Sequence, residues 1–409
     1  MRSRRVDFAC YWFRLAHETI GENGRAGLVA TNSVSQWKSR SVSLDYISQN
    51  GGYIHDAVTT QIWSGEAAVH VSVINWSKQK LEYFYLDNEH VNIINPSLRS
   101  TVNCSDSIRL KSNLNKGFVG IQPNGRGFYI NESISLKWIK LDQRNADVLK
   151  KSSSATDLAD SPNGIPNRWI IDFKDMPLED ITDYKLPFEH IKKTVKPERD
   201  NNRELVLREK WWRFKRTNEA LRSELERCNS YFIIPRHSKW FIFMKADKYW
   251  LPADSTTAIA SDDFYVLGIL TSNVHRTWVK AQSSTLKGDT RYTHNTCFET
   301  FPFPQTPIAK QIEAIRKTAI DLHEYRSAQM EKKQWGITKL YNEYFNESAS
   351  QLVKLHKTLD DLVLKAYGFS KTDDLLEKLL ALNLEVAEKE KNGESVIGPW
   401  APDKPPEAS

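Results

Sequence analysis

The chain has 409 residues, of which 40% are hydrophobic and 26% charged, as in ordinary globular proteins of two or three domains. It has no run of about 18 apolar residues, so we expect no transmembrane helix, and its start, "MRSRRVDFACYWF", lacks the small-residue cleavage site of a signal peptide. The four cysteines form no CxxC pair, which argues against a zinc knuckle or a disulfide framework and favours a reduced, cytoplasmic protein.

The first predicted elements are a helix over residues 6–20 and a buried strand over residues 26–30. Phe8, Trp12 and Ile20 recur at helical spacing, and "AGLVA" has the short apolar run of a central parallel strand. Asn32 and Ser33 follow this strand. They can cap a further helix, or they can bind a ligand at the carboxyl edge of the sheet.

An antiparallel pair of strands is predicted next. "GGYIHDAVTTQIW" at 51–63 is a strand region, and "AVHVSVINW" at 68–76 alternates apolar and polar residues after the turn "SGEA". The sequence therefore predicts an α/β unit over residues 1–94, followed by a polar connector over 95–116.

The rest of the chain changes character twice. Residues 117–305 mix short β-like runs with basic helices, which predicts an α+β domain. Residues 306–391 contain three amphipathic helices with apolar residues three and four apart, which predicts an all-α domain. Residues 392–409 show no periodicity and are expected to be disordered.

Positive charge is concentrated in one stretch, "KKTVKPERDNNRELVLREKWWRFKR" at 192–216. It holds ten Lys or Arg and four acidic residues, a net charge of +6 that equals that of the whole chain. Basic residues with interleaved aromatics suit a nucleic-acid backbone, whereas Trp211 and Trp212 by themselves suit a protein core. The candidate phosphate contacts are Lys196, Arg199, Arg203, Arg208 and Lys210.

Two further polar segments complete the predicted DNA face. Arg236, Ser238 and Lys239 follow a predicted strand in "IIPRHSKW", and Arg or Lys there can pair with guanine. The segment "KAQSSTLKGDTRY" contributes Lys280, Ser283, Ser284, Lys287 and Arg291. Any one of these residues is an ordinary surface residue by itself, but the set predicts binding to double-stranded DNA.

The usual catalytic motifs do not occur in the sequence. There is no GxxxxGK[ST] loop, no HExxH helix and no metal-ligand spacing among the histidines, so no metal site is expected. The sequence "MEKK" around Glu331 has the form of a nuclease ExK motif but lies on a predicted helix without an acidic partner. From its residues alone, the chain is predicted to bind nucleic acid and belongs to no firm enzyme class.

Several segments resemble one enzyme family in the same order along the chain. "VDFACYWFRLAH…GRAGLVATNSVSQ…IHDAVTTQIWSGEAAVHVSVINW" resembles the second half of an N6-adenine DNA methyltransferase domain of the MmeI-like restriction-modification enzymes. "NRWIIDFKDMPLEDITDYKLPFEHIKKTVKPERDNNRELVLREKWWRF" and "RYTHNTCFETFPFP" resemble the target-recognition domain of that family. "LHKTLDDLVLKAYGF…LLALNLE" resembles its C-terminal helical domain.

The resemblance implies a fold of three parts. These are a partial Rossmann-like methyltransferase half, an α+β target-recognition domain and an all-α domain. In the family, the first half of the sheet carries a Gly-rich loop for S-adenosylmethionine and an Asn-Pro-Pro-Tyr or Asn-Pro-Pro-Phe loop for the target adenine. This sequence has no such Gly-rich loop. Its nearest match to the second loop is Asn95-Pro96, which is followed by Ser97 and not by a second proline. We therefore expect no catalytic residues in this chain and no binding of S-adenosylmethionine by the chain alone.

The same resemblance suggests one base-contacting residue and one partner. Related enzymes place an aromatic wall for the extruded base at the turn before the "VHVSVINW"-like strand, where this chain has Trp63. Trp63 can equally be a residue that only caps the sheet. The implied partner is a separate N-terminal methyltransferase or nuclease half. The alternatives are a stand-alone DNA-binding specificity subunit and a degenerate remnant.

Overall fold

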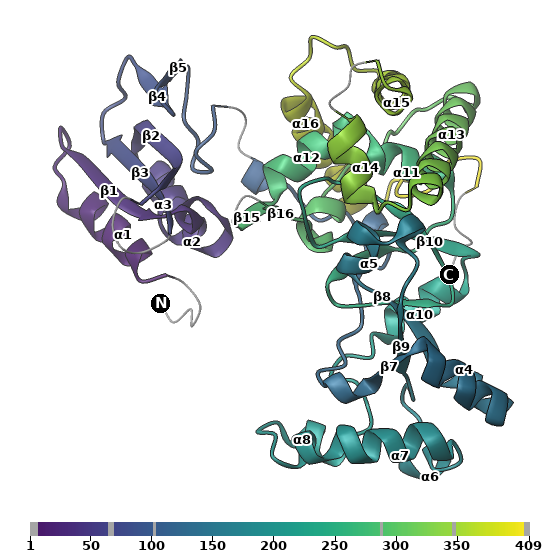
Figure 1. Ribbon diagram of the computed structural model, residues 1–409. Coiled ribbons are helices and arrows are strands. Elements are labelled where there is room, and N and C mark those ends of the chain that lie inside the picture. Colours follow the sequence, from purple (N-terminus) through teal and green to yellow (C-terminus); the bar gives the residue numbers. More distant parts are fainter. Residues whose placement is uncertain (1–6, 64–68, 101–103, 287–288, 346–348, 405–409) are drawn as a thin grey trace. The chain divides into compact units, whose positions relative to one another are not determined.

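The computed structural model describes residues 7–63, 69–100, 104–286, 289–345 and 349–404. These residues form two compact units (Figure 1). The first unit is built on the described residues between 7 and 107, with two short pieces at 284–286 and 376–381. The second contains most of the remaining chain. None of the helices in the described ranges is long and apolar enough to cross a membrane.

The first unit is an α/β structure around a five-stranded sheet of order β1-β3-β2-β4-β5. Its helices are α1 (Ala9–Thr19), α2 (Trp37–Val42) and α3 (Leu44–Gln49), with a 3-10 turn η1 (Asn32–Ser35). Its strands are β1 (Arg25–Thr31), β2 (Tyr53–Ile62), β3 (His70–Ser77), β4 (Phe84–Leu86) and β5 (Glu89–Val91). The core contains Phe13, whose ring stacks on Trp76 at 5.6 Å.

The structure corrects the predicted environment of β1. Among the described residues, β1 pairs with one strand only, and it pairs antiparallel to β3 with Val29 opposite Val73. It is therefore an edge strand in this chain and not a central parallel one. Its predicted burial is also wrong, because Ala30 is the one buried residue of β1. A short apolar run indicates a strand, but it does not specify which elements lie beside it.

The predicted apolar face of α1 is also wrong. Phe8 and Trp12 are 71% and 50% exposed, while Cys10, Phe13 and His17 are buried. The helix has apolar residues on both faces, so helical spacing alone did not identify the buried one. Phe8, Tyr11 and Trp12 contact one another with ring centroids 5.5–5.9 Å apart. We call these three residues the aromatic patch of α1.

The second unit contains two four-stranded sheets, with orders β12-β10-β14-β6 and β13-β8-β9-β7. The strands of the first are β6 (Gly117–Val119), β10 (Ser230–Pro235), β12 (Met244–Asp247) and β14 (Thr256–Ile259). Those of the second are β7 (Tyr129–Asn131), β8 (Leu149–Ser153), β9 (Arg168–Ile171) and β13 (Trp250–Pro252). A short ribbon pairs β11 (His237–Ser238) with β16 (Asp289–Arg291). The strand β15 (Ser284–Leu286) is part of the first unit. Every residue of β10 is buried, which places this strand at the centre of the unit.

The second unit also contains helices between and after its strands. They are α4 (Glu132–Leu141), α5 (Ala155–Asp160), α6 (Leu178–Ile181), α7 (Lys185–Thr194), α8 (Lys196–Asp200), α9 (Leu205–Glu209), α10 (Glu219–Glu226), α11 (Phe264–Thr271) and α12 (Asn273–Gln282). The C-terminal helices are α13 (Ala309–Lys333), α14 (Ile337–Tyr344), α15 (Gln351–Tyr367) and α16 (Leu375–Lys391). The three predicted amphipathic helices correspond to α13, α15 and α16, and α14 was not predicted.

Gly268 allows α11 to lie against α13 and α15. A Cβ atom at this position would lie 2.6 Å from Cγ2 of Ile315 and 3.3 Å from Cδ1 of Leu359. Because Ile315 is β-branched and buried, it cannot move aside freely. We expect Gly268→Ala to lower the free energy of unfolding by about 1–3 kcal/mol, as overpacking of a core does. Urea unfolding would measure this.

The control for this prediction is Gly21→Ala, because nothing lies within 4 Å of a Cβ built there. We expect the control to change stability by less than about 0.5 kcal/mol. A Gly268→Ala variant as stable as the control would show that the three helices pack more loosely than these distances indicate.

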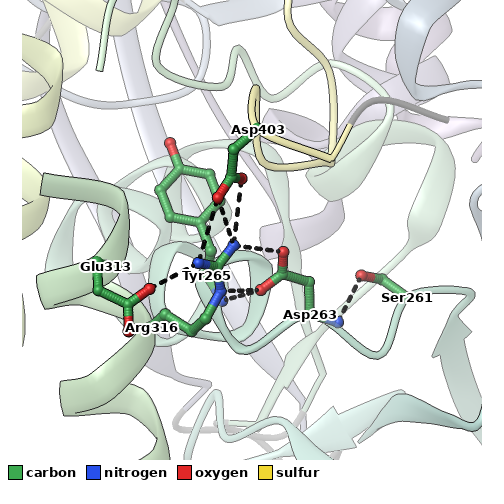
Figure 2. Close-up of polar contacts among 6 residues, drawn as sticks. All are labelled: Ser261, Asp263, Tyr265, Glu313, Arg316 and Asp403. Carbon is green, nitrogen blue, oxygen red and sulfur yellow. Dashed lines mark hydrogen bonds and ion pairs between the residues drawn. The ribbon is translucent and has the colours of Figure 1, made fainter. Parts of the chain in front are cut away.

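The C-terminal segment is ordered by a largely buried arginine, contrary to the predicted disorder of residues 392–409. Arg316 of α13 donates to both carboxylate oxygens of Asp263, at 2.9 and 3.0 Å, and also contacts Asp403 at 3.3 Å (Figure 2). Ile397 adds a second link, because its N–H and carbonyl both bond the side chain of Gln305. Lack of periodicity identified an irregular segment, but these contacts hold its described part, residues 392–404, against the unit. Residues 405–409 lie outside the described residues.

Candidate nucleic-acid interface

Three arginines from distant parts of the sequence come together in the second unit. Arg236 directly follows β10, and its backbone is fixed on both sides: its N–H donates to the carbonyl of Ser255 at 2.9 Å, and its carbonyl accepts from the N–H of Tyr292 at 2.8 Å. Arg291 therefore lies in the segment beside it. Arg216 follows the buried Phe214 and pairs with Gln122 through its backbone. We call Arg216, Arg236 and Arg291 the arginine cluster.

The charges of this cluster act on one another. The pKa of Arg236 is lowered from its ordinary value first by burial, and then by the charges of Arg291 and Arg216, while Asp254 acts in the opposite direction. Arg236 Nη1 donates to the carbonyl of Asp254 at 3.0 Å. Its Nε and that of Arg291 are buried without an acceptor in the described part of the chain. An anionic or acceptor-rich ligand would relieve both the charge repulsion and the unmet hydrogen bonds.

His294 borders the cluster at the start of the π-helix η7 (His294–Phe298). Its pKa is lowered by burial, against the effect of Glu299, and lowered further by Arg109, Arg236 and Arg216. Its Nδ1 is buried without a partner among the described residues. Neither His294 nor Arg216 was singled out in the sequence. Both residues join the cluster because the segments around residues 122, 236 and 291 lie close together in the folded chain, and no local sequence pattern predicts that proximity.

The other two residues of the predicted base-contacting segment are already engaged within the protein. Ser238 donates to the carbonyl of Trp240 at 2.5 Å. Lys239 is exposed, donates to Asn342 Oδ1 at 3.0 Å and lies over the ring of Trp240 at 5.0 Å. Of the three candidates in this segment, Arg236 is the one that the structure places in a cluster of positive charge.

Arg199 is not a phosphate contact, contrary to the prediction from charge alone. It is 1% exposed, and its guanidinium donates to the carbonyls of Pro123, Asn124 and Arg213 at 2.7–3.2 Å. It therefore fastens α8 to two other segments from inside the protein.

The other predicted phosphate contacts fall into two groups. Lys196 pairs with Asp200 at 2.9 Å, and Arg208 donates to the carbonyl of Asn202 at 2.6 Å. Arg203 and Lys210 are exposed, and the described residues give their side chains no ion pair. These last two remain the best placed for phosphate.

The core interpretation of the two neighbouring tryptophans is confirmed. Trp211 and Trp212 are 6% and 8% exposed, and Nε1 of Trp212 donates to the carbonyl of Met176 at 2.9 Å. They anchor the basic stretch to the core and leave only its charged side chains at the surface.

The predicted loop at 280–291 is described in part. Lys280 is exposed, and Oγ of Ser283 is buried without a partner among the described atoms. The backbone of Ser284 lies in β15, but its side chain is outside the described residues, as is all of Lys287. Arg291 is the member of this set that joins the arginine cluster.

In the first unit, the three candidates from the methyltransferase-like half lie at one end of the sheet. Thr31 at the end of β1 pairs with Val71, and Trp63, just past β2, donates its N–H to the carbonyl of Val69. Trp63 is 43% exposed and so available for contact. The structure does not bear out the cap interpretation of Asn32 and Ser33, because they lie inside η1, whose N-cap is Thr31.

Comparison with known proteins identifies relatives for most of the chain. The profile of the family described as "MmeI, target recognition domain" matches residues 100–305. DNA methyltransferase A of Bacillus subtilis (strain 168) is 26% identical over 414 residues, covering 94% of this chain and 44% of the relative. The type IIL restriction-modification enzyme MmeI, solved in complex with DNA, has a similar fold, with a TM-score of 0.76 and 21% identity over 94% of this chain and 52% of that one. The chain thus spans about half the length of the relatives it matches.

Proposed function

Because the chain belongs to the family of the MmeI target recognition domain, we propose that it binds double-stranded DNA and recognises the target site of an adenine-specific (N6) DNA methyltransferase of restriction-modification type. The observation that carries this proposal is the arginine cluster. Three like charges are held in one place by β10, β16 and the bridge to Gln122, together with two buried N–H groups that have no acceptor among the described residues. Such a site favours a ligand rich in anionic and acceptor oxygens.

We assign different roles to the two groups of basic residues. Guanine presents two acceptors, O6 and N7, in the major groove, and an arginine can donate to both. Arg236 and Arg291 are therefore proposed to contact base edges. Arg203 and Lys210 are exposed on or beside α9, and we propose that they contact phosphates, which position a protein on DNA without reading its sequence.

The proposal extends to the domain organisation. Residues 1–94 correspond to the second half of a methyltransferase domain, 95–116 to a connector, 117–305 to the target-recognition domain and 306–391 to a helical domain. Trp63 is proposed to contact the extruded base, since flipping a base out of the duplex requires an apolar surface to receive it. S-adenosylmethionine would be held by a partner polypeptide. The alternatives are a stand-alone DNA-binding specificity subunit and a degenerate remnant.

The partner is proposed to bind the first unit at two neighbouring features. One is the aromatic patch of α1, and the other is the free edge of β1, where Val29 is 47% exposed. A strand edge and exposed aromatics together suit a polypeptide that extends the sheet. Since the chain spans about half the length of its relatives, the proposed occupant is the other half of the methyltransferase domain.

DNA binding can be tested by the salt dependence of affinity for random duplex DNA. We expect Arg203→Ala combined with Lys210→Ala to reduce the slope of log K against log salt by about two units, one for each phosphate that the variant no longer neutralises. The control is Lys391→Ala. The Lys391 side chain is 74% exposed at the end of α16, so this variant removes one positive charge outside the proposed DNA interface. A double variant with the slope of the control would remove these two residues from the DNA interface.

Sequence recognition needs a separate measurement, namely selection of bound sequences from a randomised duplex pool. Arg236→Ala and Arg291→Ala are each expected to relax the preference at a guanine by about 1–3 kcal/mol, the usual discrimination of a bidentate contact. The phosphate variants should bind more weakly but select the same sequence. If the arginine variants keep the wild-type preference while binding more weakly, the arginine cluster contacts the DNA backbone instead of base edges.

A further inference from the structure

Three arginines that are wholly or largely buried in the second unit each have several acceptors. Arg199 has three carbonyls, Arg222 donates to both oxygens of Asp172 at 2.7 and 3.0 Å, and Arg316 has carboxylates around it (Figure 2). This is expected, because burying a guanidinium without acceptors costs several kcal/mol.

Arg326 of α13 is different. It is 2% exposed, yet its one hydrogen bond to a described residue is from Nη1 to the hydroxyl of Tyr341, at a long 3.4 Å. No carboxylate in the described ranges lies within ion-pair distance of it. Most of its N–H donors are thus unmatched by the part of the protein that the structure describes.

The guanidinium of Arg326 borders a cavity of about 440 Å³, which is in the usual size range of small-molecule sites. The cavity lies between α13, β12 and the segment around residues 163–165. Its apolar wall includes Met244, Trp250 and Met330. A ligand here would therefore meet one buried positive group and a large apolar surface.

The charges around the cavity favour an anion. His323, one helical turn before Arg326, also lines it. Burial, together with the charges of Arg326 and Lys245, lowers the pKa of His323 to about 4, so this histidine is neutral at pH 7. Lys245 and Asp247 are both exposed where β12 meets the cavity, and Asp247 accepts a hydrogen bond from the N–H of Tyr249. The buried positive charge of Arg326 is thus left without a buried counter-charge among the described residues.

We propose that this cavity is a binding site for a small organic anion, a carboxylate or phosphate monoester whose oxygens pair with Arg326 and whose apolar body lies against Trp250, Met244 and Met330. This site is additional to the DNA interface and does not depend on it. Planar bidentate pairing with carboxylate or phosphate is the interaction for which arginine is best suited.

A purely structural role for Arg326 predicts something else. The hydroxyl of Tyr341 also bonds Nε2 of His356 at 2.8 Å, and Nδ1 of His356 is 3.4 Å from Nη1 of Arg276. If Arg326 only completes this buried chain, its guanidinium matters through Tyr341 alone. The variant Tyr341→Phe separates the two roles, because it removes the hydroxyl and leaves the guanidinium beside the cavity.

The test is titration calorimetry and thermal unfolding of the full chain with benzoate, phenyl phosphate and, as a neutral control, benzyl alcohol. We expect at least one of the two anions to bind with 1:1 stoichiometry and raise Tm, and benzyl alcohol not to. The anion that binds identifies the ligand class. Arg326→Gln should weaken its binding by about tenfold or more, since the charged pair is lost, while Tyr341→Phe should keep it within about threefold.

Two further variants test whether the anion binds at Arg326 itself. If Arg326→Gln does not fold, Arg326→Lys retains the charge without the bidentate fork and is expected to bind phenyl phosphate or benzoate more weakly than the wild type. Arg236→Ala, which alters the DNA interface, should leave anion binding unchanged. The proposal is overturned if neither anion binds at millimolar concentration, or if the Arg326 variants bind as tightly as the wild type.

Discussion

Replacing Asp263 with asparagine is expected to lower the free energy of unfolding by about 3 kcal/mol, since removing one partner of a largely buried ion pair leaves the other charge uncompensated. Asp263 accepts two hydrogen bonds from Arg316 (Figure 2) and also one from the N–H of Tyr265 at the start of α11. Asparagine keeps the shape and can still cap the helix. The loss therefore reports the charge pair that joins α11 to α13.

The effect should depend on pH in a defined direction. Burial raises the pKa of Asp263, but the hydrogen bonds and charge of Arg316 outweigh burial and hold it below its ordinary value. A carboxylate with a lowered folded-state pKa contributes stability above its unfolded-state pKa of about 3.9, and this contribution is lost as pH falls through the folded value. In urea unfolding from pH 7 to pH 3, Asp263→Asn should therefore lose less stability than the wild type.

The matched control is Asp403→Asn, because Asp403 contacts the same guanidinium but is 44% exposed. Exposed pairs contribute about 0–1 kcal/mol, so this variant should remain close to wild type at both pH values. Equal losses of unfolding free energy from the two variants would mean that Asp263 stabilises the protein no more than the exposed Asp403 does.

The sequence predicted best where one property decided the structure. Of the series Ile308, Ile312, Ile315, Ala319 and Leu322, the last four are buried in α13, because a single apolar face has only one way to pack. Ile308 is 61% exposed, since it lies at the N-cap of the helix. In α1 the same pattern failed, since Phe8 and Trp12 compete with Cys10 and Phe13 for the core. Strand regions were found, but the antiparallel edge position of β1 depends on partners that a local pattern does not specify.

The candidate site was predictable only in its chemistry. Counting charges identified residues 192–216 as basic, but it could not distinguish exposed Lys210 from buried Arg199, whose acceptors come from residues 123, 124 and 213. Likewise, Arg236 and Arg291 were named on different segments, and only the tertiary structure brings them together with Arg216. Contacts between residues far apart in sequence depend on the whole fold. The sequence therefore predicts which residue types take part in the site, but not which residues lie beside one another.

Methylation gives the largest expected effect, because it should be absent from this chain alone and restored by a partner. Transfer to adenine requires the methyl donor and the amino nitrogen to be held in line, and such positioning can contribute roughly 7–11 kcal/mol. The sequence contains no Gly-rich loop followed by an Asn-Pro-Pro-aromatic loop. We therefore expect no tritium transfer from labelled S-adenosylmethionine to duplex DNA by this chain, and transfer when a polypeptide carrying those loops is added.

Two substitutions separate docking of the partner from reception of the base. Trp12→Ser removes the centre of the aromatic patch of α1 and should weaken association of the two polypeptides, measured by sedimentation, as well as methylation. Trp63→Ala should leave association unchanged and reduce methylation by about tenfold or more, since a stacked base contributes about 1–3 kcal/mol. Tyr249→Ser, which removes an aromatic that is 69% exposed in the second unit, is the control for both.

Each outcome of these assays supports a different proposal. Methyl transfer by this chain alone would mean that other residues replace the two loops, and would overturn the proposed dependence on a partner. Association without methylation, with both polypeptides folded and DNA bound, would favour a degenerate remnant. If Trp12→Ser binds the partner as tightly as the wild type, the partner does not cover α1, and the free edge of β1 alone would remain as its docking site, because that edge exposes backbone groups that a strand of the partner can pair with.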